Sequence, residues 1–119
     1  LVVLSACNTG RDGAESDRGE GFTGLTRSFM YAGADALAVT LWPVESSSAK
    51  RLTEEAYRSL AMAEDLESGA RALAFARAKR AMLARPHRIV LDPLDSEGGS
   101  ISTDHPFFWA PFILVGDGQ

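Results

Sequence analysis

The chain contains a single cysteine, Cys7, among its 119 residues, which excludes an internal disulfide. It also lacks any run of about 18 apolar residues that could cross a bilayer, and no signal peptide is visible. An excess of positive charge is missing too, because 12 basic residues stand against 16 acidic ones. Nucleic-acid affinity rests largely on neutralising phosphates, so a formal charge of −4 argues against a nucleic-acid binder. We therefore expect a cytoplasmic protein with no membrane or nucleic-acid partner.

The composition that remains is typical of a folded domain. Apolar residues make up 45% of the chain and charged residues 24%, and the length suits one ordinary domain. The chain opens at Leu1 inside an apolar run, without a methionine or a lead-in segment. We therefore expect residues 1–119 to be the C-terminal part of a single larger domain.

Three segments have the pattern of strands. Leu1–Leu4 and Ala36–Trp42 are continuously apolar, as expected for parallel strands buried on both faces. Such strands need neighbours on both sides to satisfy their backbone hydrogen bonds. Phe112–Gly116 reads as a third strand, and Ile89–Leu91 is either a short strand or a buried loop anchor.

Helical spacing of apolar residues predicts three helices between these strands. The first runs from Phe22 to Ala32, with Gly33 as its stop, and so forms a βαβ unit with the strands around it. The second follows serines 46–48 as N-cap candidates, and the third spans about Glu67 to Arg85. Its predicted inner residues are Ala70, Leu73, Ala74, Ala78, Ala81 and Met82. The fold class is therefore α/β, a sheet with flanking helices.

Cys7 stands directly after the first predicted strand. The carboxyl ends of strands in open α/β sheets hold ligands and chemistry, so this thiol is either a reactive thiolate or a small buried hydrophobe. The turn from Cys7 to Gly10 can present backbone N–H groups to an oxyanion, and Gly10 permits an unusual backbone shape. The polar, glycine-rich stretch that follows, residues 8–21, reads as a surface loop beside the thiol.

Acidic residues of that loop are the second candidate group, and they include Asp17 and Glu20. They either line a pocket for a basic side chain or belong to an ordinary solvated loop. Glu20 is the best candidate, although it can equally accept amide hydrogens at the helix start. Trp42, at the end of the second strand, is either a pocket wall or a capped edge of the core.

Neither histidine is expected to act as the base. His105 precedes an aromatic patch and reads as a structural imidazole, and His87 reads as a solvent-facing residue in a basic turn. A basic run on and after the third helix is a solvated face or, less simply, a surface for an acidic partner domain. The run comprises Arg71, Arg77, Lys79, Arg80, Arg85 and Arg88.

Five short strings occur in a fixed order over nearly the whole chain. They are Leu4-Ser5-Ala6-Cys7-Asn8-Thr9-Gly10, Gly19-Glu20-Gly21-Phe22, Tyr31-Ala32-Gly33-Ala34, Leu41-Trp42-Pro43-Val44, and His105-Pro106-Phe107-Phe108-Trp109-Ala110-Pro111-Phe112 with Val115-Gly116-Asp117. Together they resemble the CHAT domain, a family of caspase-like, separase-related cysteine peptidases that is often found behind tetratricopeptide repeats.

The resemblance implies a caspase-like sheet in which Cys7 is the nucleophile of a Cys-His dyad. The family's histidine comes from a preceding strand, and this chain has no residue at that position. The implied function is therefore a cysteine endopeptidase whose histidine lies upstream, with a polypeptide substrate that carries a basic residue at the cleavage point. The candidates for substrate binding are Glu20, Asp17 and Trp42 from the residue patterns above, and no metal or organic cofactor is implied.

Two other functions remain open from the sequence. One is a catalytically inactive caspase-like scaffold in a signalling assembly, since a fold does not fix a function. The other is a nucleotide-binding α/β domain in which Cys7 is a buried structural thiol. Against the latter, none of the expected strands runs directly into a Gly-x-Gly-x-x-Gly or Walker-type loop.

Overall fold

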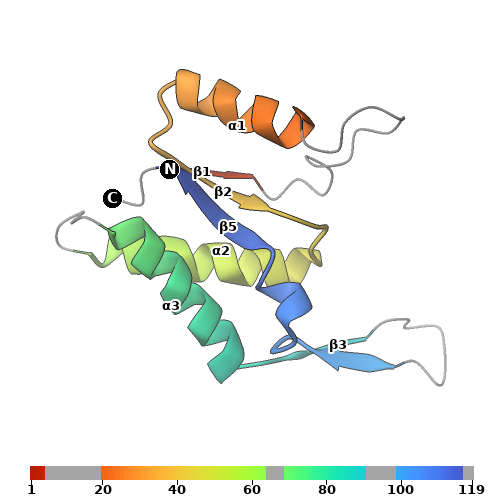
Figure 1. Cartoon of the computed structure of the whole chain (residues 1–119). Helices are drawn as coiled ribbons and strands as arrows, with labels where there is room; N and C mark the ends of the chain where they lie inside the picture. The colour runs from red at the N-terminus through yellow and green to blue at the C-terminus, as the bar shows by residue number, and fades with distance from the viewer. Residues whose placement is uncertain (5–19, 64–68, 91–98, 117–119) are drawn as a thin grey trace.

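The computed structural model describes residues 1–4, 20–63, 69–90 and 99–116. Its main body has three layers, a three-stranded sheet with one helix on one face and two on the other (Figure 1). Helix α1 (Glu20–Tyr31) covers one face, and α2 (Ser46–Ala61) and α3 (Ala70–Ala84) cover the other. The predicted α/β class is confirmed. None of the helices in these ranges is long and apolar enough to span a membrane.

Strand β2 (Ala36–Thr40) lies in the middle of the sheet, between β1 (Val2–Leu4) and β5 (Phe112–Gly116). It pairs in parallel with β1 and antiparallel with β5. All five residues of β2 are buried, as the continuously apolar pattern predicts for a central strand. Within the described ranges β1 pairs with β2 alone and is half-buried, so a second neighbour for β1 stays a prediction.

The βαβ unit β1–α1–β2 ends its helix at a glycine, as expected. Gly33 has a φ of +92°, and its N–H donates to the carbonyl of Met30 at 3.0 Å. The N–H of Ala34 donates to the carbonyl of Phe29, also at 3.0 Å. These two bonds form a Schellman motif, which satisfies helix carbonyls that would otherwise lack partners and turns the chain into β2.

A second glycine with positive φ allows the end of β5 to lie close to α1 and to the turn that follows it. Gly116 has a φ of +100°, and a Cβ built on it would lie 2.6 Å from the Asp35 carbonyl oxygen and 2.6 Å from Met30 Cε. We expect Gly116→Ala to lower the free energy of unfolding by about 2–4 kcal/mol, because backbone strain and overpacking add. Urea unfolding of the full chain measures this loss.

Gly33→Ala is the matched control for that substitution. Gly33 has a similar φ, yet nothing lies within 4 Å of its added Cβ. Its loss should therefore be about 1–2 kcal/mol, from the left-handed backbone alone. Equal losses at Gly116 and Gly33 would mean that the close approach of β5 to α1 has no energetic weight.

Helix α2 is capped by Glu45, which corrects the expectation that a serine is the N-cap. The Glu45 carboxylate accepts from the backbone N–H groups of Ser47 and Ser48 at 2.8 and 2.9 Å. Both serine hydroxyls donate to its Oε2, at 2.7 and 3.0 Å. The serines are thus the first helical residues rather than caps, because the longer Glu45 side chain reaches two N–H groups at once.

The cap makes the stability of the helix depend on pH. Burial raises the pKa of Glu45, but hydrogen bonds from Ser47 and Ser48 outweigh it and lower the pKa from 4.5 to about 2. Because the folded pKa lies below the unfolded one, the stabilisation is fully present above pH 4.5 and is lost as the pH falls toward 2.

We expect Glu45→Gln to lower the free energy of unfolding at pH 7 by about 1 kcal/mol, the usual value of a helix cap. Its unfolding curve should also depend less on pH between 4.5 and 2 than that of the wild type. Ser46→Ala is the control, since the hydrogen bonds that lower the pKa of Glu45 come from Ser47 and Ser48, and it should keep most of the dependence. Parallel pH profiles for the wild type and Glu45→Gln would contradict this account, and denaturant unfolding at a series of pH values decides it.

Helix α3 packs on α2 through a face of small and flexible residues. Ala74, Ala78 and Met82 are buried as predicted, and Phe75 is buried as well although its position was not predicted. Leu73 is 45% exposed, so the prediction that it faces inward is wrong. The buried face is centred between Phe75 and Ala78, which turns Leu73 to solvent. The predicted start of this helix at Glu67 lies outside the described residues.

A two-stranded ribbon lies at the far end of α3, apart from the main sheet (Figure 1). Strand β3 (Arg88–Val90) pairs antiparallel with β4 (Ser100–Ser102). The strand alternative for residues 89–91 is thus confirmed at 89 and 90. Strand β4 is not expected from the sequence, because Gly98-Gly99-Ser100 is typical of a flexible turn. The strand that pairs with β4 is also distant in sequence.

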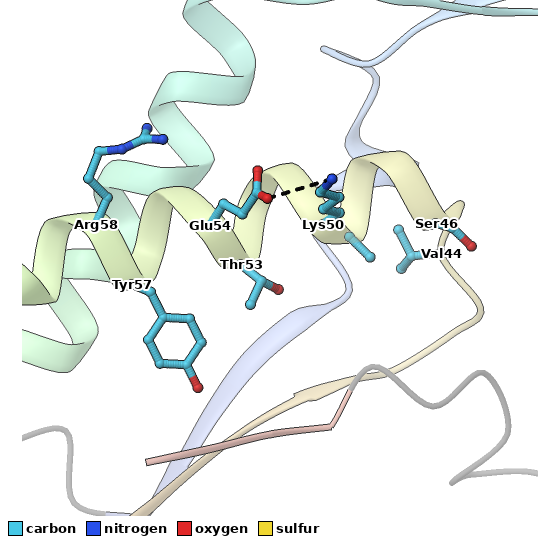
Figure 2. A pocket seen from close by; sticks show the side chains of 8 residues that line it. Val44, Ser46, Lys50, Thr53, Glu54, Tyr57 and Arg58 are labelled. Carbon is cyan, nitrogen blue, oxygen red and sulfur yellow. Dashed lines mark ion pairs between the residues drawn. The ribbon is translucent and has the colours of Figure 1, made fainter.

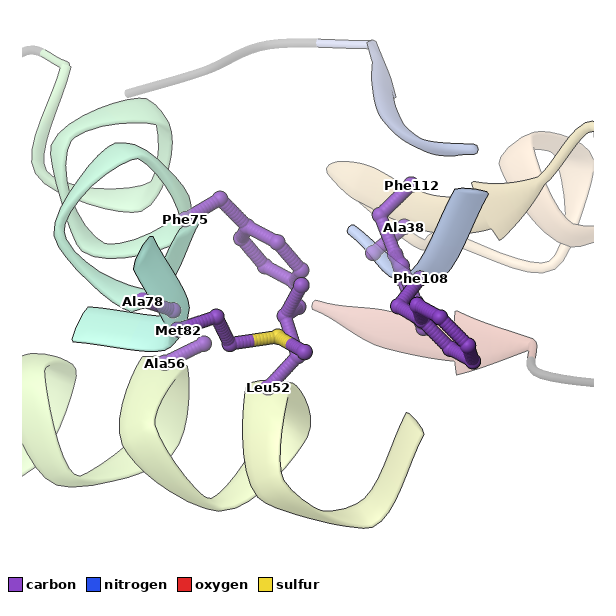
Figure 3. Close-up of a cluster of buried hydrophobic side chains, with 8 residues drawn as sticks. All are labelled: Ala38, Leu52, Ala56, Phe75, Ala78, Met82, Phe108 and Phe112. Atoms are coloured by element: carbon purple, nitrogen blue, oxygen red, sulfur yellow. The ribbon is translucent and has the colours of Figure 1, made fainter. Parts of the chain in front are cut away.

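The hydrophobic core lies between the sheet and the layer of α2 and α3 (Figure 3). Side chains from both helices meet residues of β2 and β5 and of the 3-10 helix η1 (Pro106–Phe108). Successive strand residues point to opposite faces, so alternate residues of β2 serve the opposite α1 side. The core members are Ala38, Leu52, Ala56, Phe75, Ala78, Met82, Phe108 and Phe112.

Candidate functional site

The carboxyl ends of β1 and β2 lie at the same edge of the sheet. Leu4, the last residue of β1, stands opposite Val39 of β2, and the two strands run parallel. From Val39 the chain continues through Thr40 to Trp42. This edge is where an open α/β sheet carries its chemistry.

Most of the predicted site residues cannot be placed against this edge. Cys7, Gly10 and Asp17 lie outside the described residues, so their roles stay predictions. Glu20 is the first residue of α1, and only its backbone is described. Trp42 is the one predicted site residue whose side chain the structure describes.

Trp42 forms an aromatic shelf with Phe107, and we use that name for these two residues. The indole Nε1–H donates to the Phe107 carbonyl at 3.0 Å, and the ring centroids are 6.3 Å apart with a 30° tilt. Phe107 in turn meets the buried Phe108 edge-on, with centroids 5.5 Å apart. The shelf is therefore anchored to the core on one side.

The other side of the shelf is open. Phe107 is 47% exposed, and Leu41, beside Trp42 in sequence, is 55% exposed. Trp42 is half-buried and its N–H has a partner, as expected for a capped edge of the core, and the pocket-wall alternative stays a prediction. Sequence reasoning did not assign Phe107 to the site, because no local spacing signals a contact across 65 positions.

The His105 side chain forms a hydrogen bond with the backbone. It is exposed, and its Nδ1 accepts a hydrogen bond from the Phe107 N–H at 3.2 Å, which caps η1. A neutral imidazole that accepts at Nδ1 carries its proton on Nε2. His105 in this form has no free basic nitrogen, which agrees with the structural role expected for it, although it acts as a cap rather than as packed core.

His87 is not the solvent-facing residue that the sequence suggested. It is half-buried, and its Nδ1 lies 3.1 Å from the Thr103 hydroxyl and in contact with the Arg51 guanidinium. Its backbone N–H donates to the same hydroxyl at 2.9 Å, and Nε2 lies 3.5 Å from Ser47 Oγ. Arginine can only donate, so Nδ1 is an acceptor and this nitrogen is already engaged. The residue joins α2 to the ribbon, a tertiary contact with no local sequence signal.

The basic run is not uniformly solvated. Lys79 is half-buried and donates to the Phe112 carbonyl at 2.7 Å, and burial lowers its pKa. Arg71 pairs with Asp35 at 3.4 Å, and Arg88 donates to Ser100 Oγ. The solvated-face expectation holds for Arg77 and Arg80, which are exposed.

A surface hollow of about 630 Å³ lies along α2 (Figure 2). Thr53 and Tyr57 project from the helix toward the side where β1 runs. Lys50 and Glu54 form an ion pair of 3.8 Å between exposed side chains, a kind of pair that contributes little to stability. Trp42 does not line this hollow. The residues that do are Val44, Ser46, Ala49, Lys50, Thr53, Glu54, Tyr57 and Arg58.

Comparison with known proteins identifies the family of this chain. A family model described as the CHAT domain matches residues 1–117. The chain belongs to the CHAT family. That family is part of the caspase-like superfamily, in agreement with the resemblance of the five sequence strings.

Two curated relatives of this CHAT chain carry the same name. Tetratricopeptide repeat protein 28 of Mus musculus is 31% identical over 116 residues, and that of Homo sapiens is 30% identical over 116 residues. Each alignment covers 98% of this chain and 4% of the relative. The chain thus spans a small part of the length of these relatives. No solved structure matches it.

One glycine pattern in the CHAT chain needs a separate account. Gly19, Gly21 and Gly24 have the Gly-x-Gly-x-x-Gly spacing of a dinucleotide-binding loop. In such loops the glycines follow the strand directly, and the third allows the helix to pack closely on it. Here residues 5–18 separate β1 from the first glycine, and nothing lies within 4 Å of a Cβ added to Gly24. The spacing therefore lacks the context that nucleotide binding requires.

Proposed function

We propose that the CHAT chain supplies the nucleophile, Cys7, of a cysteine endopeptidase. The observation that carries the proposal is the parallel pairing of Leu4 with Val39, because both strands then end at one edge. Cys7 follows Leu4 by three residues in the sequence. The aromatic shelf follows β2 at the same edge, where it can support a bound polypeptide.

The base in this proposal comes from outside the 119 residues. An ordinary thiol is mostly protonated at neutral pH and needs a neighbouring imidazole to remove its proton. His105 and His87 both use Nδ1 as an acceptor, so the proposed peptidase needs a histidine from elsewhere in a longer protein. Residues 1–119 would then be the C-terminal part of one CHAT domain, with tetratricopeptide repeats upstream as the names of the relatives suggest.

The reaction proceeds in two steps. The Cys7 thiolate attacks the carbonyl carbon of the substrate, and the oxyanion is stabilised by the backbone N–H of Cys7, in the turn that Gly10 permits, and by a second N–H from the upstream histidine loop. The C–N bond breaks, the amine leaves with the proton from the imidazolium, and a thioester remains on Cys7. Water, deprotonated by the same imidazole, then attacks the thioester and releases the carboxylic acid and the thiol.

Substrate preference is assigned to the acidic residues and to the aromatic shelf. Asp17 and Glu20 would receive a basic side chain at the cleavage point through charge-assisted hydrogen bonds. Trp42 and Phe107 would receive an apolar neighbour of that residue. A cytoplasmic location is part of the proposal, since a free thiolate persists in a reducing compartment.

Replacing Trp42 tests the wall of the substrate site. In the longest native protein that carries this chain, Trp42→Ala should raise KM about tenfold for peptides with an apolar residue beside the cleavage point. Trp42→Phe keeps an aromatic face and loses the hydrogen bond to the Phe107 carbonyl, so its effect should be about two- to threefold. Both changes in KM are measured by steady-state kinetics with pairs of peptides that carry either an apolar residue or glycine beside the cleavage point. A KM that is unchanged by Trp42→Ala would remove the shelf from the substrate site.

The proposed activity itself is tested with a peptide library, again in the longest native protein that carries this chain. We expect cleavage after Arg or Lys, read by mass spectrometry, and complete loss of cleavage once Cys7 is alkylated. Cleavage that survives alkylation would contradict the proposal.

An inactive caspase-like scaffold is the second candidate function. It is favoured by one observation, the engagement of Nδ1 in both His87 and His105. If no base reaches Cys7 from elsewhere, the thiol stays protonated. A native protein that cleaves no peptide, and whose Cys7 reacts no faster than a free thiol, would support this function instead.

A further inference from the structure

The outer face of α3 differs from that of a usual surface helix. We define this face by Leu73, Ala76, Arg77, Arg80, Leu83 and Ala84. Both leucines are 45% exposed, and both arginines are exposed. A surface helix normally carries charged and polar residues on its solvent side and apolar residues on one stripe only.

Helix α2 shows the usual pattern next to it. Its exposed cations are paired with acids on the same helix, Lys50 with Glu54 at 3.8 Å and Arg58 with Glu55. Helix α3 contains Arg71, Arg77, Lys79 and Arg80 and no acidic residue at all. Among the residues that the structure describes, Arg77 and Arg80 make no ion pair.

The spacing of the residues on the outer face is suited to packing against another helix. Leu73, Ala76, Arg80 and Leu83 follow one another at intervals of three, four and three residues, the a and d pattern of a coiled coil. Alanine at position 76 allows close approach of a partner backbone, and the leucines on either side provide knobs for its grooves. Arg77 and Arg80 then set the charge that the partner must carry.

We propose that the outer face of α3 binds an acidic amphipathic helix of another polypeptide or domain. Its leucines would pack against Leu73 and Leu83, and its carboxylates would pair with Arg77 and Arg80. A nucleic acid fits less well, because the chain has a net charge of −4 and exposed leucines flank the arginines. The face is independent of the proposed peptidase edge, so its test does not rely on peptide hydrolysis.

The probe is a fluorescent three-heptad helical peptide with leucine at a and d and glutamate at e and g. We expect the full 119-residue chain to bind it and to lose at least tenfold in affinity after the double change Arg77→Glu and Arg80→Glu. The same variant should gain affinity for a peptide with lysine in place of glutamate. Fluorescence anisotropy gives both affinities, and higher salt should weaken binding of the wild-type chain.

Two controls separate a docking face from general charge. Arg27→Glu with Lys50→Glu changes the net charge equally at other helices and should leave the affinity within about twofold. Leu73→Ser keeps both arginines and should weaken binding several-fold, with circular dichroism to confirm that each variant is folded. The proposal is overturned if the two double variants lose affinity equally, if a glutamine peptide binds as well, or if duplex DNA or anionic vesicles bind more tightly.

Discussion

Cys7→Ser is expected to lower kcat/KM for peptide hydrolysis by about a thousandfold or more in the longest native protein that carries this chain. The substitution keeps the size of the side chain nearly unchanged and replaces a thiol by a hydroxyl, which a base adapted to a thiol does not deprotonate at neutral pH. Cys7 is the only cysteine of the chain, so no neighbouring thiol within it can substitute. Initial rates with a fluorogenic arginyl peptide measure the loss.

Ser5→Ala is the matched control for Cys7→Ser. It removes a small hydroxyl two positions away and should change the rate less than threefold. Cys7→Ala should match Cys7→Ser, because both remove the nucleophile. Activity of Cys7→Ala within tenfold of the wild type would show that Cys7 is not the nucleophile.

Phe112→Ala should cause the largest loss of stability among single substitutions in the core, about 3–5 kcal/mol. Phe112 is 1% exposed at the start of β5, and it packs with Leu52 of α2, Phe75 of α3 and Ala38 of β2 in one cluster. Truncation leaves a cavity where the sheet meets both helices. Urea unfolding of the full chain, followed by circular dichroism, gives the change.

Phe107→Ala is the control, since Phe107 is also an aromatic residue of this region but is 47% exposed. Its loss should stay near 1 kcal/mol, from its contacts with Trp42 and Phe108. If Phe112→Ala does not fold, Phe112→Leu keeps most of the volume and should cost about 1–2 kcal/mol. Equal losses for the exposed and the buried phenylalanine would contradict the core described above.

The sequence predicts the main body of the fold because its signals there are local. Continuous apolar runs mark β1, β2 and β5, and glycine marks the end of α1. Errors arise where a distant residue decides the structure. His87 is held by Arg51 and Thr103 rather than by its neighbours, and strand β4 exists because β3 pairs with it.

Side-chain orientation on α3 and α2 was predicted less well, for two different reasons. Helical periodicity cannot fix which of several similar faces turns inward, so Leu73 was placed in the core and Phe75 was not. At α2 the general preference for serine as the N-cap predicts the wrong residue, because Glu45 accepts from both free N–H groups with one carboxylate. Within the candidate site, Trp42 is a candidate because of its place after a strand, whereas Phe107 becomes one only through the tertiary contact.

The rate at which iodoacetamide alkylates Cys7 tests the central claim most directly. The reagent reacts with the thiolate, and peptide mapping by mass spectrometry locates the label on the native protein. At pH 6.5 we expect Cys7 to react at least tenfold faster than the thiol of a free cysteine peptide, and to slow to the rate of that peptide once the protein is unfolded in urea. A folded protein whose Cys7 reacts no faster than the free peptide would contradict a nucleophile at the end of β1.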